Sequence, residues 1–279
     1  MTTRSIARNV APIHTYEGAG FGVYRPFPQP ELELLDPFLL LDEMEPRTVA
    51  PGEAKGAPDH PHRGFETVTY VLEGEVEHRD SQGNRGHIGP GDVQWMTAGA
   101  GLVHSEMPST ALQTNGGPLH GFQLWVNLPA ADKMIRPRYQ ALTADQIPVV
   151  DGDGWHARVI AGSVGGVEGA TRTHTPVTYA HVTIDAGRTA TFDFPADFNV
   201  GTYVFSGGPR ELRTWRPEVG EIELVAGDEP LELLVMAGRP LNEPVARYGP
   251  FVMNTRQQLV EAADDFNAGR MGSIAPEQG

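Results

Sequence analysis

The sequence predicts an all-β protein with two domains, and three observations lead to that prediction. Runs rich in Val, Ile, Thr and aromatic residues recur at short intervals with turn residues between them, a pattern typical of β-sandwiches and barrels. Glycine (33 residues) and proline (24 residues) are both abundant, which suits many short strands and turns rather than long helices. The 279 residues are enough for two hydrophobic cores of ordinary domain size.

The first domain is expected at residues 1–132 and holds a succession of short strands. A mostly apolar strand is expected at residues 32–41. A β-branched run at residues 67–78 predicts another strand, and Gly74 within it indicates a bulge or a sharp corner. Further strands, each preceded by turn residues, are expected at residues 86–96 and 120–128.

A linker with one or two short helices is expected at residues 133–148, and a second β-domain at residues 149–279. Near the end of the chain, apolar residues recur at helical spacing, so residues 251–266 are expected to form an amphipathic helix with Thr255 as a possible N-cap. A polar tail begins at Gly269. The strands of the second domain are expected at residues 157–161, 177–184, 189–194, 201–206, 222–225 and 231–237.

Composition and charge exclude several classes of protein. Hydrophobic residues make up 39% and charged residues 20% of the chain, as in globular proteins. The net charge of −15 argues against direct nucleic-acid binding, because a phosphate backbone selects a basic surface. Without cysteine, the chain forms no disulfide, thiolate nucleophile or iron–sulfur cluster. No signal peptide and no apolar run of membrane-spanning length is found, so we expect a soluble, cytoplasmic monomer.

Two pairs of side chains that can bind metal suggest the functional site. His60 and His62 form one pair, and His104 and Glu106 form the other. Side chains alternate between the two faces of a strand, so both members of each pair point the same way. If the two strands meet in a barrel, three imidazoles and one carboxylate converge on a divalent ion.

One carboxylate competes with Glu106 for this assignment. Glu66 shares strand parity with His62 if the strand is regular between them, although Arg63 and Gly64 interrupt the pattern. We therefore take Glu106 as the ligand and keep Glu66 as a supporting residue or alternative ligand. The opposing interpretation is that His60 and His62 lie in a solvated loop and bind nothing.

The donor set limits the metal and its chemistry. Three neutral histidines and one carboxylate leave two of six octahedral positions open, for a bidentate anion or for substrate and dioxygen. The absence of thiolate favours Fe(II), while Mn, Ni, Cu and Zn also bind such donors. We expect no second metal site, because His174 and His181 lack a partnering pair. The remaining isolated histidines are expected at the surface or in hydrogen bonds: His14, His78, His87 and His156.

The motifs around these residues resemble those of the pirin family, the bicupin branch of the cupin superfamily. The matching segments are HPHRGFETVTYVLEG at residues 60–74, GAGLVHSE at 99–106, GFQLWVNLP at 121–129 and GPFVMNT at 249–255. The resemblance implies two cupin β-barrels of jelly-roll type packed together, with one metal in the N-terminal barrel. It also implies that the ligands are His60, His62, His104 and Glu106, and that the metal is usually iron.

The resemblance implies two kinds of function. Several bacterial pirins open flavonols such as quercetin with dioxygen and release carbon monoxide; here Glu106 would accept the proton of the substrate hydroxyl. The substrate could also be another small aromatic enol. The animal relative is instead described as a nuclear, iron-dependent transcriptional co-regulator. That alternative predicts a non-enzymatic, redox-sensing protein that acts through a protein partner.

Overall fold

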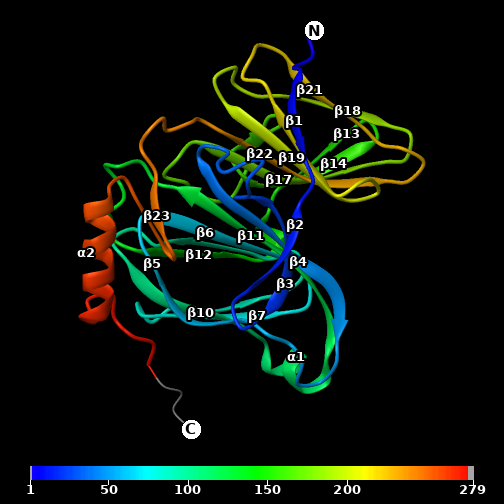
Figure 1. Cartoon of the computed structure of the whole chain (residues 1–279). Helices are drawn as coiled ribbons and strands as arrows, with labels where there is room; N and C mark the ends of the chain where they lie inside the picture. The colour runs from blue at the N-terminus through cyan, green and yellow to red at the C-terminus, as the bar shows by residue number, and fades with distance from the viewer. Residues whose placement is uncertain (1, 276–279) are drawn as a thin grey trace. The chain divides into compact units, whose positions relative to one another are not determined.

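The computed structural model describes residues 2–275, which form two compact units (Figure 1). Unit 1 contains residues 2–13, 26–39 and 145–241, and unit 2 contains residues 14–25, 40–144 and 242–275. The chain therefore passes between the units more than once. This division differs from the expected domains at residues 1–132 and 149–279. The N-terminal residues belong to unit 1, together with residues 145–241, and the C-terminal residues belong to unit 2, together with residues 40–144.

Long-range contacts explain this difference. Inside unit 1, β1 (Ile6–Val10) pairs with β20 (Glu211–Trp215), about two hundred residues later. Inside unit 2, β24 (Phe251–Met253) and α2 (Arg256–Asn267) bury apolar side chains against Val103 in one core cluster. No local sequence pattern predicts either contact.

Unit 2 contains a seven-stranded sheet and a four-stranded antiparallel sheet. The larger sheet has the order β12 (Arg138–Leu142), β9 (Val93–Thr97), β6 (Phe65–Glu73), β11 (Gly117–Asn127), β4 (Phe38–Val49), β3 (Phe21–Phe27) and β2 (Ile13–Glu17). The smaller sheet has the order β5 (Ala57–His62), β10 (Leu102–Pro108), β7 (Val76–Asp80) and β8 (Arg85–Ile88). A short helix, α1 (Thr110–Asn115), follows β10.

Gly74 divides the expected strand at residues 67–78 into β6 and β7, which belong to different sheets. Its φ is +83°, and a Cβ atom there would lie 2.6 Å from the carbonyl oxygen of Pro118. Only glycine adopts such a corner without strain. The predicted sharp corner at this position is confirmed.

Unit 1 has a second seven-stranded sheet, in which the order is β1, β20, β19 (Asn199–Ser206), β22 (Leu231–Gly238), β17 (Val177–Ile184), β14 (Trp155–Ala161) and β13 (Val149–Gly152). Three two-stranded sheets complete the strands of the described chain: β18 (Thr189–Asp193) with β21 (Glu221–Val225), β15 (Ser163–Val164) with β16 (Val167–Glu168), and β23 (Ala246–Tyr248) with β24. The six strands expected in the second half of the sequence are therefore confirmed, and so is the all-β class.

The expected linker is partly wrong. Residues 138–142 form the strand β12, which pairs with β9 at the edge of the larger sheet of unit 2. A single 3₁₀ turn follows at Ala144–Gln146. The segment is only five residues long, so its sequence period does not distinguish a strand from a short helix.

The C-terminal helix is confirmed, but it is shorter than expected. Its first residues, 251–253, form β24, and α2 begins after Thr255, whose side chain accepts a hydrogen bond from the Gln258 backbone. Gln258 returns the interaction to the N-cap backbone, completing a capping box. The expected polar tail extends beyond residue 275, and residues 276–279 lie outside the described part. No helix among residues 2–275 is both long and apolar enough to cross a membrane.

Candidate metal centre

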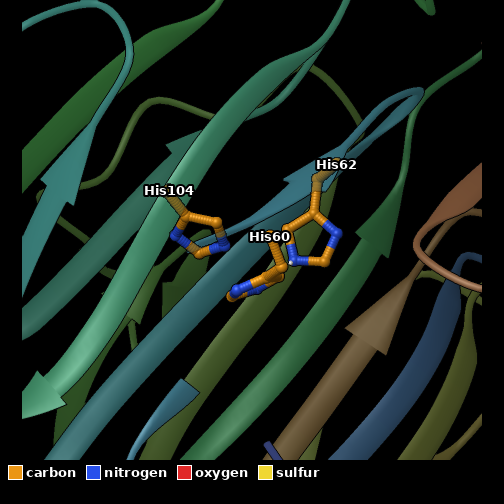
Figure 2. Close-up of side chains that lie close together, drawn as sticks. All are labelled: His60, His62 and His104. Atoms are coloured by element: carbon orange, nitrogen blue, oxygen red, sulfur yellow. Dashed lines mark hydrogen bonds between the residues drawn. The ribbon is translucent and has the colours of Figure 1, made fainter. Parts of the chain in front are cut away.

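The pairing of β5 with β10 brings three histidines together, as strand parity predicts. His60 lies directly opposite His104, and His62 lies opposite Leu102, next to that pair. The three imidazoles face one another in Figure 2, with ring centroids 4.3 to 4.9 Å apart. One ring nitrogen from each lies within 4.8 Å of the others. This spacing is close enough for a single ion.

Backbone carbonyls assign the tautomers of His60 and His62. Nδ1 of His60 lies 2.7 Å from the carbonyl oxygen of Pro58, and Nδ1 of His62 lies 3.2 Å from that of Pro250. A carbonyl oxygen can only accept, so both Nδ1 atoms carry the proton and both Nε2 atoms present lone pairs. The two Nε2 atoms are 3.1 Å apart. Two lone pairs at that distance repel each other unless a proton or a metal ion lies between them.

His104 supports the same conclusion. It is fully buried, and neither of its ring nitrogens has a hydrogen-bond partner among residues 2–275. Burial, followed by the neighbouring histidines, holds the pKa values of His62 and His104 well below the usual range. Both rings are therefore neutral, the form that binds a metal. The residues present fit a divalent ion.

Glu106 lies on the same strand as His104 and is held by two polar side chains. Its Oε1 accepts hydrogen bonds from Thr69 Oγ1 and, at 3.1 Å, from Gln94 Nε2. Its carboxylate forms a second close group with His104 and His78, again within 4.8 Å. The structure thus gives two donor groups that share His104, rather than one group of the four expected residues.

Glu66 belongs to neither donor group. It is fully buried on β6, and its Oε1 accepts a 2.6 Å hydrogen bond from Thr97 Oγ1. Gly64, with a φ of +89°, separates it from His62. This turn breaks the regular alternation that the alternative assignment of Glu66 requires.

His78 lies closer to the metal centre than its isolated position in the sequence suggests. It is expected at the surface or in a hydrogen bond, and it does form a 3.3 Å hydrogen bond with Asp80; it is also buried beside His104, which the sequence does not predict. His78 and Asp80 are two residues apart, the same spacing as in the two predicted pairs. This spacing is the sequence feature that could have placed His78 near the metal centre. His14, His87 and His156 are exposed, as predicted.

A cavity of about 780 Å³ opens onto this centre within unit 2. Its residues include His60, His62 and Glu106 from the centre, together with Thr69 and Gln123. The other lining side chains are mainly apolar or charged: Phe21, Val23, Leu40, Leu119, Trp125, Asp42, Lys55 and Arg247. A mostly apolar pocket with a few polar groups is typical of small-molecule sites.

Trp125 and Arg247 form one wall of the cavity. The Arg247 guanidinium lies 4.8 Å from the centroid of the Trp125 ring. Trp125 also packs against Phe65 and His62, with centroid distances of 4.3 and 5.1 Å. Burial, and then the charge of Arg25, lower the pKa of Arg247. The cavity therefore places a partly exposed cation next to an aromatic wall and the metal centre.

A buried ion pair adjoins this wall. Arg25 donates hydrogen bonds to both carboxylate oxygens of Asp42, at 2.7 and 2.6 Å, and also to Glu17. Although these bonds favour the ionised form, burial has the larger effect and raises the pKa of Asp42 to about 6.

Lys133 fixes the turn that follows His62. Its buried ammonium donates to the carbonyl oxygens of Gly64 and Val252 and to Oδ1 of Asn127, at 2.7, 3.1 and 2.7 Å respectively. A Cβ atom on Gly64 would lie 2.0 Å from the same Val252 oxygen. The turn and the C-terminal strand β24 are thus held in direct contact beside the centre.

Comparison with known proteins gives consistent matches over both halves of the chain. A family model described as Pirin matches residues 20–126, and one described as Pirin C-terminal cupin domain matches residues 179–272. Pirin from Homo sapiens is 38% identical, covering 97% of this chain and 95% of that protein. A pirin-like protein from Caulobacter vibrioides is 41% identical, covering 97% of this chain and 100% of that protein.

A solved structure agrees with these matches. The crystal structure of quercetin 2,3-dioxygenase from Acinetobacter baumannii superposes on this chain with a TM-score of 0.92. The two sequences are 39% identical, and the match covers 98% of this chain and 100% of that one. Two cupin domains, as the motifs predicted, are therefore confirmed.

Proposed function

This chain belongs to the pirin family, and on that premise we propose that it is a metal-dependent dioxygenase that opens flavonols such as quercetin. Dioxygen is the second substrate and carbon monoxide a product. The observation that carries the proposal is the cluster of three histidines, with the Nε2 atoms of His60 and His62 3.1 Å apart, at the wall of a mostly apolar cavity. The similarity to the Acinetobacter baumannii quercetin 2,3-dioxygenase supports it.

The residues that would hold the ion are His60, His62, His104 and Glu106. Imidazoles with one carboxylate and no thiolate favour Fe(II), and Mn, Ni, Cu and Zn also bind this donor set. When bound, such an ion supplies Lewis acidity and redox chemistry. The protein supplies the fixed donors, since carbonyl partners orient two of the imidazoles.

Glu106 is the residue that we assign to proton transfer. It lines the cavity, and both of its hydrogen bonds, from Thr69 and Gln94, are made to Oε1. Its other oxygen, Oε2, therefore accepts the proton of the flavonol 3-hydroxyl. A carboxylate within hydrogen-bond reach of that proton acts as a general base.

Trp125 and Arg247 orient the substrate. A planar ring system packs against the aromatic wall, and the guanidinium stabilises the negative charge that develops when the hydroxyl loses its proton. The apolar side chains around them exclude water from the enolate. Together these residues select a planar aromatic enol.

The test joins metal analysis to turnover. Purified protein loaded with Fe(II) is incubated with quercetin under air, and oxygen consumption and carbon monoxide release are both measured. We expect oxygen consumption and carbon monoxide release to rise in proportion to metal content. Both should disappear in a His62→Ala variant. His87→Ala, which alters an exposed histidine, serves as the control and retains full activity.

The same assay separates the other candidate functions. An iron-loaded protein that consumes no oxygen with any enol contradicts the dioxygenase and favours the regulatory protein with a protein partner. Oxygen consumption with another aromatic enol but not with quercetin keeps the reaction class and changes the substrate.

A further inference from the structure

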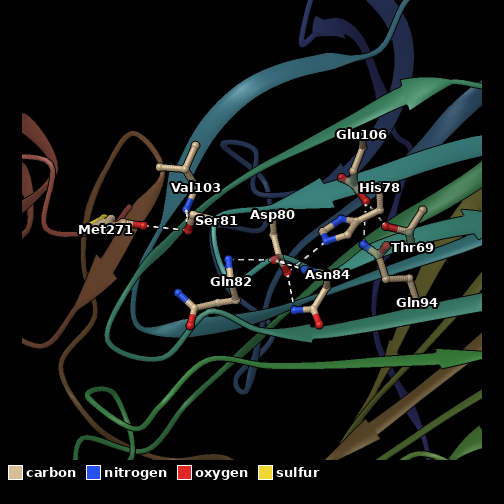
Figure 3. A network of polar contacts seen from close by, with 10 residues as sticks. All are labelled: Thr69, His78, Asp80, Ser81, Gln82, Asn84, Gln94, Val103, Glu106 and Met271. Atoms are coloured by element: carbon tan, nitrogen blue, oxygen red, sulfur yellow. Dashed lines mark hydrogen bonds and ion pairs between the residues drawn. The ribbon is translucent and has the colours of Figure 1, made fainter. Parts of the chain in front are cut away.

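A second polar cluster lies beside the predicted ligands, on strand β7. In the pairing of β7 with β10, His78 lies opposite Glu106, and Asp80 lies opposite His104. All four side chains therefore point to the same face of the sheet. Figure 3 shows His78 between Glu106 and Asp80, with Thr69 and Gln94 next to the Glu106 carboxylate.

Asp80 sets the orientation and tautomer of His78. Its carboxylate accepts hydrogen bonds from the backbones of Gln82 and Asn84, both at 2.9 Å, and from Asn84 Nδ2 at 2.8 Å. An anchored carboxylate 3.3 Å from His78 Nε2 fixes the ring proton on that nitrogen. The lone pair of His78 is thus on Nδ1, which is buried and has no hydrogen-bond partner among residues 2–275.

Tyr139 stacks against the His78 ring. The two rings stack with centroids 4.8 Å apart and an interplanar angle of 25°. The Tyr139 hydroxyl reaches Gly86, where a Cβ atom would lie only 1.8 Å from the oxygen. His78 is therefore fixed by stacking and by a carboxylate, the way that proteins commonly orient a metal-binding histidine.

We propose that the centre has a second, inner metal position formed by His78, His104 and Glu106. Donor atoms of these three residues lie within 4.8 Å of one another. Two histidines and one carboxylate are the donor set of many non-haem Fe(II) sites. The inner group shares His104 with the group of three histidines, and Glu106 with the proposed ligand set, so a single ion occupies either position.

The two positions differ in their relation to the cavity. His60, His62 and Glu106 of the outer set line it, whereas Glu106 is the only inner ligand that does so. An ion in the inner position is thus held mainly by buried side chains that do not line the cavity. This inference depends on the metal centre but not on flavonol chemistry, so its readouts are metal binding and metal location.

The first experiment measures Co(II) binding to the full-length protein by equilibrium dialysis and visible absorption. His60→Ala/His62→Ala removes only outer ligands, and we expect it to retain one ion per chain. Adding His78→Asn to that variant is expected to weaken the residual binding by at least ~100-fold. Adding His87→Asn instead, on the neighbouring strand β8, leaves it unchanged. Residual binding that is absent, or that persists without His78, overturns the proposal.

A second experiment covers the case in which the double variant does not fold. Crystals of the single variant His60→Ala, which alters a half-buried residue, are loaded with Co(II), and anomalous scattering locates the ion. We expect the peak among His78, His104 and Glu106. A peak held by His62 and His104, away from His78, overturns the inner position. Absence of quercetin turnover in the unaltered, metal-loaded protein counts against the proposed function alone.

Discussion

The Nε2 atoms of His60 and His62 lie 3.1 Å apart, and the Nδ1 atom of each ring lies against a backbone carbonyl oxygen. In the neutral rings two lone pairs face each other, and a metal ion that accepts both of them relieves this repulsion. The neighbouring His104 is buried and neutral. A bound divalent ion therefore interacts favourably with all three histidines.

Metal binding is expected to stabilise the fold. An ion that binds only the folded state at a hundred times its Kd raises the free energy of unfolding by about 2.7 kcal/mol. Thermal or urea unfolding with and without Fe(II) or Co(II) measures this gain, and a chelator reverses it. The gain should be smaller in His62→Ala, which loses a ligand of the outer position, and should persist in full in His87→Ala. An equal gain in both variants would mean that the ion binds elsewhere.

The metal-free protein is expected to lose stability as the pH falls. His62 and His104 have folded-state pKa values well below the ordinary 6.5, so the unfolded chain binds more protons than the folded protein in that range. The free energy of unfolding is therefore highest above about pH 7.5 and declines as the pH falls through 6.5. Each histidine contributes up to about 1.4 kcal/mol per pH unit.

Urea unfolding at pH 7.5, 6.5 and 5.5, with a chelator present, measures this dependence. His104→Gln cannot titrate, so its decline should be shallower than that of the original protein by up to one proton's contribution. All other titratable groups are the same in both proteins, so the difference between the two slopes reports the contribution of His104. Equal slopes would show that His104 is protonated in the folded protein.

Much of the outer site could be predicted from sequence because its geometry is local. His60 and His62, like His104 and Glu106, are two residues apart, and strand alternation alone places each pair on one face. The strand runs and the N-cap at Thr255 are local for the same reason. What remained open was the choice between Glu106 and Glu66, and the turn at Gly64 explains why parity does not extend to Glu66.

The rest depends on partners that are distant in the sequence. His78 looked isolated because its neighbours come from β10 and from Tyr139 on β12, in different sheets. The division into units was missed because β1 pairs with β20, and no local pattern predicts that register. Tyr139 itself lies in a segment that was expected to be a linker. Sequence periodicity identifies strands, but not which strands are neighbours.

Glu106→Gln is expected to keep the metal and lose turnover. Glutamine has nearly the same shape and can still accept a hydrogen bond from Thr69, but it cannot take the substrate proton. General-base catalysis typically contributes 10²- to 10⁴-fold, so kcat with quercetin should fall by about 10²-fold or more. Metal content is measured in the same sample. Unchanged turnover at full metal occupancy would remove the proposed role of Glu106.

Arg247→Met is expected to weaken flavonol binding. The variant keeps an apolar contact with Trp125 but loses the cation, which contributes about 0.5–2 kcal/mol to such contacts. We therefore expect KM for quercetin to rise about three- to thirtyfold, with a smaller effect on a neutral analogue that lacks the 3-hydroxyl. Arg239→Met is a matched control, because it removes an arginine that lies 5.9 Å from Phe198, in unit 1. Equal changes in both variants would exclude a specific role for Arg247.

Lys133→Met is expected to destabilise unit 2 and disturb the metal centre. The change leaves three buried acceptors, on Gly64, Asn127 and Val252, without the ammonium that they share. Losing a hydrogen bond from a charged donor to a buried acceptor costs about 1–3 kcal/mol, so a loss of about 3 kcal/mol or more in the free energy of unfolding is expected. Because Gly64 follows His62 by two residues, metal affinity should fall as well. Lys55→Met, at an exposed lysine, should change stability by less than about 0.5 kcal/mol. If Lys133→Met is as stable as Lys55→Met, the contact between the turn and β24 does not depend on the ammonium.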